Sequence, residues 1–550
     1  MVLRHDYVTL YVDGIRYLDK PPLPYWLGAI GIHLFGVHDW AVRLPLALSV
    51  LALILYVYSL AGRLYGERAG FYAGCVMATC VGPFIFTRFF IPDVMVALWM
   101  TIAADLTLRM IDSVEKAGKA TVGQVCAFAA VIAAGMLTKG LIGIVFPVGV
   151  LLVYLALIGK LRYLLRMRLL LGVSLTLILA LPWHILAAIQ NPPSGEAKGW
   201  FWFYFINDQI NRYLNKRIPR DYDKVPFFAF WGLLLVWLAP WTFYLLGAAR
   251  QWWRKRRAVE ASPLLLFIVW ALFILLFFSF STRQEYYTIP AIPALALLVG
   301  HFLREEERGE TGAPYWGKLA SGILFAIGLA VAVVCGYFAL AAHHPPPGKE
   351  LYQVIVEHPE YYARSFGHVY DLTTTALSFF RAPLAGTAIG MLFGTGLAFF
   401  LRFRRRYFAA NLALTLSMCL VLMCVHAAYR TFYPILGSEP LAEVINHQWQ
   451  SGDLIVIDGQ YSDASSVGFY TEQPLYMLNG RVNNLWYGSL FADAPHRFED
   501  DASFAKLWSG SQRVFFITDK PGKWTSLASQ GGLWTLYSYA GKSILSNRPS

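Results

Sequence analysis

Long apolar stretches separated by short polar turns make up most of the first 427 residues. A helix needs about 20 mostly apolar residues to cross the hydrocarbon core of a bilayer. The pattern therefore predicts a multi-pass α-helical membrane protein with twelve spans. These spans are expected near 44–62, 69–87, 94–110, 122–138, 141–158, 169–189, 226–247, 263–281, 288–303, 319–341, 383–401 and 408–427.

The stretch 22–36 is apolar and aromatic but too short to span a membrane. We expect it to form an interfacial helix, within a loop that takes up residues 1–43. The transmembrane core is then expected over residues 44–427.

The pattern changes after residue 427 to short β-prone runs, such as 453–458 and 513–518, with Gly, Asn and Asp turns between them. A helical pattern at 440–450 precedes the first run. Residues 428–550 are therefore predicted to form a small soluble α/β domain. Asp458 ends the first run, where a turn or capping role is favoured over ligand binding. The absence of a glycine-rich loop after either run argues against a Rossmann nucleotide site.

Composition supports the membrane interpretation. Of the 550 residues, 57% are hydrophobic and only 15% are charged, which is not typical of a soluble domain. The net charge of +12 does not indicate a nucleic-acid partner, because Lys and Arg cluster between the apolar runs. All six cysteines fall inside hydrophobic runs, so we interpret them as core residues.

The positive charge also predicts orientation, because cytoplasmic loops retain Lys and Arg. Alternate loops, among them 63–68, 160–168 and 402–406, are basic. With twelve spans, both termini and the α/β domain then lie outside the cytoplasm. The polar first forty residues would have to be translocated without a preceding span. We therefore expect an upstream helix and interpret Met1 as an internal methionine.

Polar groups at the outer ends of spans are candidates for chemistry, because their burial is costly and function often explains the cost. The clearest cluster runs from Tyr17 through Asp19 and Lys20 to Tyr25. Two prolines follow Lys20 and restrict the backbone, which holds the lysine at the membrane surface. Such a lysine suits a phosphate, although a snorkelling cation in an aromatic belt explains the pattern equally well.

Other polar residues are expected on the same side, and each alone is more typical of topology or capping. Together they predict a cationic, tyrosine-rich pocket for a lipid-linked phosphate. A transporter would instead concentrate polar groups at the bilayer midplane, where only Asp105 and His184 are candidates. The residues of the predicted pocket, besides those of the first cluster, are Arg88, Asp93, Lys139, Arg212, Arg283, Tyr286 and Tyr287.

These motifs resemble a known family. The Tyr-Leu-Asp-Lys-Pro-Pro-Leu element, the Thr-Lys-Gly turn at Lys139 and the Arg-Gln-Glu-Tyr-Tyr-Thr-Ile-Pro turn at Arg283 are similar to those of bacterial lipid-A aminoarabinose transferases. More broadly, they resemble GT-C glycosyltransferases of the dolichyl-phosphate-mannose protein mannosyltransferase type. The resemblance implies a monomeric protein of the bacterial inner membrane with a periplasmic C-terminal domain.

The resemblance also implies a reaction. A polyprenyl-phosphate-linked sugar is the donor, no further cofactor takes part, and the acceptor attacks the anomeric carbon with inversion. Lys20, Arg212 and Tyr287 would bind the lipid phosphate, and Asp93 would be a supporting acidic residue. Tyr17 and Tyr25 would line the sugar or prenyl channel. The rest of the cavity would comprise Asp19, Arg88, Lys139, Arg283 and Tyr286.

The sequence departs from the family pattern in two respects. The family's principal catalytic aspartate follows a first transmembrane helix, upstream of where Met1 would align, so the activity of the chain alone stays open. Family members have thirteen spans, which agrees with the expected upstream helix. A family metal position pairs Glu with His, where this chain offers Asp19 and Asn207. Because asparagine is a weak zinc ligand, we predict no metal.

The leading hypothesis is sugar transfer from undecaprenyl phosphate to lipid A or another envelope glycan. Protein O-mannosyl transfer is a second enzymatic interpretation, and a flippase or transporter of lipid-linked sugars is a third.

Overall fold

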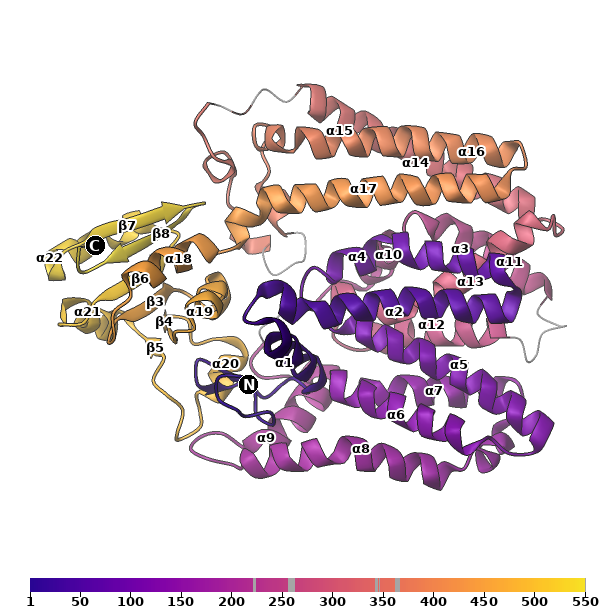
Figure 1. Cartoon of the computed structure of the whole chain (residues 1–550), viewed down its shortest axis with the longest axis horizontal. Coiled ribbons are helices and arrows are strands. Elements are labelled where there is room, and N and C mark those ends of the chain that lie inside the picture. Colours follow the sequence, from indigo (N-terminus) through magenta and orange to yellow (C-terminus); the bar gives the residue numbers. More distant parts are fainter. Residues whose placement is uncertain (221–223, 256–262, 342–344, 346, 362–366, 550) are drawn as a thin grey trace.

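The computed structural model describes residues 1–550 except 221–223, 256–262, 342–344, 346, 362–366 and 550. Long helices lie side by side, and a small sheet domain stands beyond one end of them (Figure 1). The N-terminus lies at this same end, close to helices α1 (Leu23–Phe35) and α20 (Asn483–Gly488). This arrangement confirms the predicted fold class.

Eight helical segments in the described part of the chain are long and apolar enough to cross a membrane. A ninth span is formed if α10 (Phe227–Trp237) and the helix after it are counted together, although they are bent by 106°. The eight are α2 (Asp39–Tyr65), α5 (Asp93–Ala117), α6 (Val122–Lys139), α8 (Leu169–Gln190), η5 with α13 (Glu285–Glu307), α14 (Ala313–Ala341), η9 to α16 (Ala376–Phe403) and α17 (Tyr407–Leu436).

The other predicted spans are also helical but shorter. Helices α7 (Ile142–Leu157) and α12 (Pro263–Ser279) have 16 and 17 residues. The predicted span 69–87 is divided at Cys80 into α3 (Glu67–Thr79) and α4 (Val81–Phe86). Pro83 explains the division, because it has no N–H to donate to the carbonyl of Thr79. The predicted short helix at 22–36 is α1 (Leu23–Phe35), with 13 residues.

The C-terminal domain contains a six-stranded sheet with the order β5-β4-β3-β6-β8-β7. The two predicted strands, β3 (Leu454–Asp458) and β6 (Val514–Thr518), are its parallel central neighbours. The others are β4 (Leu475–Leu478), β5 (Phe498–Glu499), β7 (Trp534–Tyr539) and β8 (Lys542–Ser546). Asp458 accepts hydrogen bonds from Thr518 and Trp524, both at 2.7 Å. The division into residues 1–43, 44–427 and 428–550 stays a prediction, and α17 continues to Leu436.

The sheet domain is fixed against segments that carry the candidate site. Arg16, in the hairpin of β1 (Tyr11–Val12) and β2 (Ile15–Arg16), binds both carboxylate oxygens of Asp493, at 2.5 and 2.9 Å. The Tyr487 hydroxyl donates to the carbonyl of Gly199 at 3.0 Å. Its ring stacks on Phe203, with centroids 3.9 Å apart.

Arg402 joins the outer layer of helices, α14 to α17, to the core. Its side chain is fully buried and donates to both oxygens of the buried Glu306 on α13, at 2.8 and 3.1 Å. It also donates to Tyr244 on α11 (Tyr244–Lys255) at 2.5 Å, and to Asn411 on α17. The sequence pattern placed Arg402 among the basic loop residues, whereas the structure makes it a buried link between helices.

We predict that Arg402→Met destabilises the protein by about 3–5 kcal/mol, because the substitution leaves the Glu306 carboxylate buried without its main partner. Thermal unfolding of the purified protein in one detergent measures the effect. Arg404→Met is the control, since Arg404 is exposed in the same basic segment. Equal unfolding temperatures for the two variants would contradict this structural role.

Candidate active site

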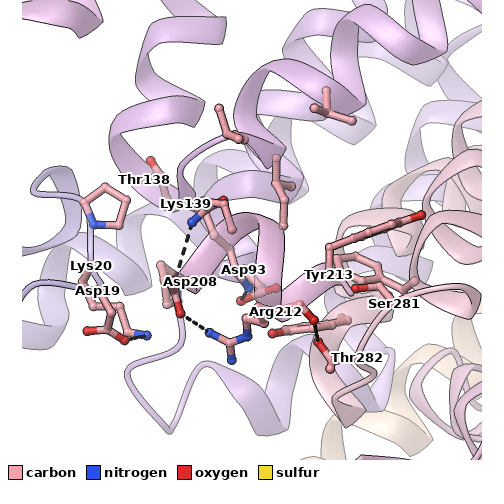
Figure 2. Close-up of a pocket in the computed structure, with 18 of the residues that line it drawn as sticks. Asp19, Lys20, Asp93, Thr138, Lys139, Asp208, Arg212, Tyr213, Ser281 and Thr282 are labelled. Atoms are coloured by element: carbon pink, nitrogen blue, oxygen red, sulfur yellow. Dashed lines mark hydrogen bonds and ion pairs between the residues drawn. The ribbon is translucent and has the colours of Figure 1, made fainter. Parts of the chain in front are cut away.

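A cavity of about 470 Å³ lies at the end of the helical bundle that faces the C-terminal domain. The loop before α1, the ends of α5, α6 and α7, the segment around residue 210, and the turn after α12 line it. Figure 2 shows its polar side chains in a row from Asp19 and Lys20, through Asp208 and Arg212, to Tyr213 and Thr282. The volume is typical of a ligand pocket.

Three ion pairs set the charge of this cavity. Lys20 lies 2.7 Å from Asp19, and Arg212 lies 3.1 Å from Asp208. Lys139 pairs with Asp93. The carboxylates are almost fully buried, whereas the side chains of Lys20, Arg212 and Lys139 are 36%, 21% and 20% exposed. The predicted cations are therefore assembled, and each has a carboxylate beside it.

Local sequence explains the position of Lys20. Pro21 and Pro22 follow it directly, and α1 begins at Leu23. The prolines lack N–H groups, but residues at the start of a helix do not donate hydrogen bonds within it. Burial opposes the charge of the lysine, but Asp19, Tyr17 and Asp208 attract it. The result is a pKa of Lys20 well above its usual range, so the ammonium group stays charged.

The pair of Lys139 and Asp93 joins two helix ends. Asp93 is the first residue of α5 and Lys139 is the last of α6, so both charges are favoured by the helix dipoles. Gly140 ends α6 with a φ of 71°. The ammonium of Lys139 lies 4.8 and 5.2 Å from the ring centroids of Tyr287 and Tyr286, which stabilises the cation further.

Arg212 follows the π-helix η2 (Trp202–Asn211), an irregular element that is frequent at functional sites. Asp208 lies four residues earlier on the same helical face and accepts from Arg212. It also accepts from Arg217, with Nε at 3.0 Å. Burial disfavours the charge of Asp208, but Arg212 and Arg217 hold its pKa below the usual range. The sequence interpretation missed Asp208, although its i,i+4 spacing from Arg212 was a usable signal.

The structure brings most of the predicted site residues together and gives two of them other partners. Arg88 donates to the carbonyl of Phe84 at 2.6 Å, and Arg283 donates to those of Val225 and Ser279 at 2.9 and 2.8 Å. The side chains of both arginines therefore bind backbone carbonyls and stabilise the local chain. The predicted residues that line the cavity are Asp19, Lys20, Asp93, Lys139, Arg212, Tyr286 and Tyr287.

Tyr17 and Tyr25 line a second cavity of about 630 Å³. It lies between the N-terminal segment, α1 and the loop after α19 (Ser465–Thr471) of the sheet domain. Phe90 lines both cavities, and its ring centroid is 6.4 Å from that of Tyr25. Charged residues such as Arg4 and Arg497 line the second cavity as well.

The residues at the family's metal position do not fit a zinc site. The amide oxygen of Asn207 accepts from the N–H of Ile218 at 3.0 Å, and its nitrogen donates to the Ile218 carbonyl at 2.5 Å. Asp19 is bound by Lys20. Among the described residues, no group of three or more His, Cys, Asp or Glu side chains could hold a metal. That the protein works without a metal stays a prediction.

Comparisons with known proteins agree with the motifs. The family described as dolichyl-phosphate-mannose-protein mannosyltransferase matches residues 19–186. An undecaprenyl phosphate-alpha-4-amino-4-deoxy-L-arabinose arabinosyl transferase of Erwinia tasmaniensis is 30% identical over 308 residues, which are 55% of this chain and 52% of that protein. One of Pseudomonas aeruginosa is 29% identical over 321 residues, 56% of this chain and 54% of its own length. The matched part is thus about half the length of these relatives.

Solved structures show the fold. The crystal structure of ArnT from Cupriavidus metallidurans bound to undecaprenyl phosphate matches with a TM-score of 0.77 and 23% identity, over 100% of this chain and 92% of that one. The same protein in the apo state matches with a TM-score of 0.74. The chain therefore has the fold of this ArnT structure, and part of its sequence is similar to undecaprenyl phosphate-linked aminoarabinose transferases, as its sequence motifs indicate.

Proposed function

We propose that the chain transfers a sugar from an undecaprenyl-phosphate-linked donor, of the aminoarabinose type, to lipid A or another envelope acceptor. The observation that carries this proposal is the convergence of Lys20, Lys139 and Arg212 on one cavity at the end of the helical bundle. Three basic groups around an opening lined by apolar side chains suit a phosphate attached to a lipid. The relatives that share the motifs are named for such a donor.

In this proposal the first cavity binds the donor phosphate. Lys20, Arg212 and the hydroxyl of Tyr287 contact its oxygens, and Lys139 lies next to the tyrosine rings. During transfer, the bond from the anomeric carbon to the phosphate oxygen breaks as a bond to the acceptor oxygen forms. Negative charge then builds up on the departing phosphate, and the preorganised cations stabilise it.

The acceptor oxygen attacks from the face opposite the phosphate, which inverts the anomeric carbon, and its proton passes to a base. Asp93 supports the reaction by holding Lys139 in place. The second cavity, with Tyr17 and Tyr25, is the proposed approach for the acceptor because Phe90 connects it to the first. Aromatic rings suit the apolar faces of sugars. We place both cavities and the C-terminal domain on the periplasmic side of the inner membrane, in a monomer that needs no further cofactor.

The transport interpretation is less well supported. Asp105 accepts from Tyr56 at 2.8 Å and from Arg109 at 3.0 Å, and it also pairs with Arg63. His184 contacts the carbonyl of Ala180 at 2.8 Å. Both midplane candidates therefore have structural roles. Protein O-mannosyl transfer remains the second candidate, because the family that matches residues 19–186 carries that description.

We predict that membranes containing the protein transfer labelled sugar from its undecaprenyl phosphate donor to a lipid acceptor, with loss of the donor. Lys20→Gln and Arg212→Gln each lower the rate by about 100-fold or more, because a charge that stabilises the leaving phosphate is lost. Thin-layer chromatography separates labelled lipid from labelled protein, and so distinguishes the two candidate reactions.

Lys216→Gln is the matched control, since Lys216 is exposed and lies near Arg212 in the chain. Its rate should equal that of the wild type. Donor that reaches the opposite leaflet without a covalent product would establish transport instead, and wild-type rates in Lys20→Gln and Arg212→Gln would overturn the assigned site.

Gly140→Ala tests the position of Lys139. An alanine Cβ would lie 2.9 Å from the Tyr204 hydroxyl and 3.1 Å from Nε2 of Gln209, at a φ of 71° that favours glycine. The turn must shift, and we expect transfer to fall at least about tenfold, since small misplacements in an active site cost that much. Initial rates at matched protein levels measure the effect.

Gly118→Ala is the control for this substitution. Gly118 ends α5 with a φ of 75°, but its Cβ would meet no atom within 4 Å. Gly118→Ala should leave the transfer rate near that of the wild type, and an unchanged rate in Gly140→Ala would contradict the role of this turn in placing Lys139.

A further inference from the structure

At the wall of the first cavity, two arginines share one buried carboxylate oxygen. Oδ1 of Asp208 accepts from Nη1 of Arg212 at 3.1 Å and from Nε of Arg217 at 3.0 Å. The two arginines differ in position. Arg212 lines the cavity with a side chain that is 21% exposed, whereas the side chain of Arg217 is 2% exposed. Figure 2 shows the bond between Asp208 and Arg212 at the cavity wall.

This geometry bears on how Arg212 binds a phosphate. In the structure, Nη1 of its guanidinium donates to Asp208, so a phosphate that takes this donor must compete with the carboxylate. If Arg212 were the single partner of Asp208, its movement toward a phosphate would leave the buried Asp208 carboxylate uncompensated, which is strongly unfavourable. The same carboxylate would also repel the phosphate. A second cation bound to Asp208 lowers both the free-energy cost of the uncompensated carboxylate and its repulsion of the phosphate.

Contacts and burial hold the side chain of Arg217 in place. Besides Asp208, it donates to the carbonyl of Pro219 at 3.3 Å, and its residue is only 3% exposed. It comes from the segment after η2 and does not line the cavity. Arg217 therefore neutralises Asp208 through a contact that does not involve Arg212.

We propose that Arg217 is a positioning residue for donor binding: by holding Asp208, it allows Arg212 to exchange that carboxylate for the phosphate of the lipid donor. This inference rests on the proposed function. It assigns the buried Arg217 and Asp208 a role in setting the affinity of the site for a phosphate, although the sequence interpretation identified neither of them.

The test is binding of undecaprenyl phosphate to the full chain in nanodiscs, measured as Kd by tryptophan fluorescence. Arg217→Gln should weaken binding at least about tenfold, because Asp208 then competes fully for Arg212. Arg217→Lys, which keeps the charge, should fall between this variant and the wild type. In the double variant Arg217→Gln with Asp208→Asn, the competing carboxylate is gone, and binding should return to within about threefold of wild type.

Because the double variant also removes an uncompensated buried carboxylate, recovery of the fold alone could restore binding. The unfolding temperature of each variant in the same nanodiscs separates the two roles: weaker binding in Arg217→Gln at an unchanged unfolding temperature cannot come from a lost fold. Unchanged binding in Arg217→Gln, or a double variant as weak as Arg217→Gln, would overturn the inference while leaving the proposed function intact. No binding of undecaprenyl phosphate by the wild type would overturn the proposed function and this inference together.

Discussion

The candidate site depends on three buried carboxylates that hold three cations at the mouth of a mostly apolar cavity. Asp19, Asp93 and Asp208 are almost fully buried, and each would be costly without its basic partner. Both members of each pair line the cavity, and each carboxylate holds its cation there. Each cation of the site already has a carboxylate partner, so a phosphate that binds there lies beside these carboxylates and competes with them for the cations. This requirement makes the affinity depend on residues behind the cavity wall.

Much of the surrounding architecture serves to keep these pairs in place. Asp93 and Lys139 depend on where α5 begins and α6 ends, and Gly140 allows the sharp turn between α6 and α7. The prolines after Lys20 fix the start of α1. The C-terminal domain binds the N-terminal hairpin through Arg16 and the segment before η2 through Tyr487, and so clamps the segments that carry Lys20 and Arg212. At the outer helix layer, the buried Arg402 links four helices.

The sequence was informative where a pattern is local. Runs of apolar residues predicted helices at all twelve spans, and short β-prone runs between turns predicted strands β3 and β6. Motif resemblance identified Lys20, Asp93, Arg212 and Tyr287, which do converge on one cavity.

The sequence could not show which charged residues form ion pairs in the folded protein. The sequence pattern of a basic residue near a helix end is the same for an exposed side chain, such as Arg404, and for one buried against a carboxylate, such as Arg402. For the same reason Arg88 and Arg283 resembled site residues, and the shared contact of Asp208 with Arg212 and Arg217 was not foreseen.

The most direct measurement is a cryo-electron microscopy structure of the chain in nanodiscs with undecaprenyl phosphate. The account predicts phosphate density within about 3 Å of Nζ of Lys20 and of the guanidinium of Arg212, with Arg212 turned away from Asp208 and Arg217 still bound to it. Phosphate density elsewhere on the protein, with the ion pair of Arg212 and Asp208 intact, would contradict the account.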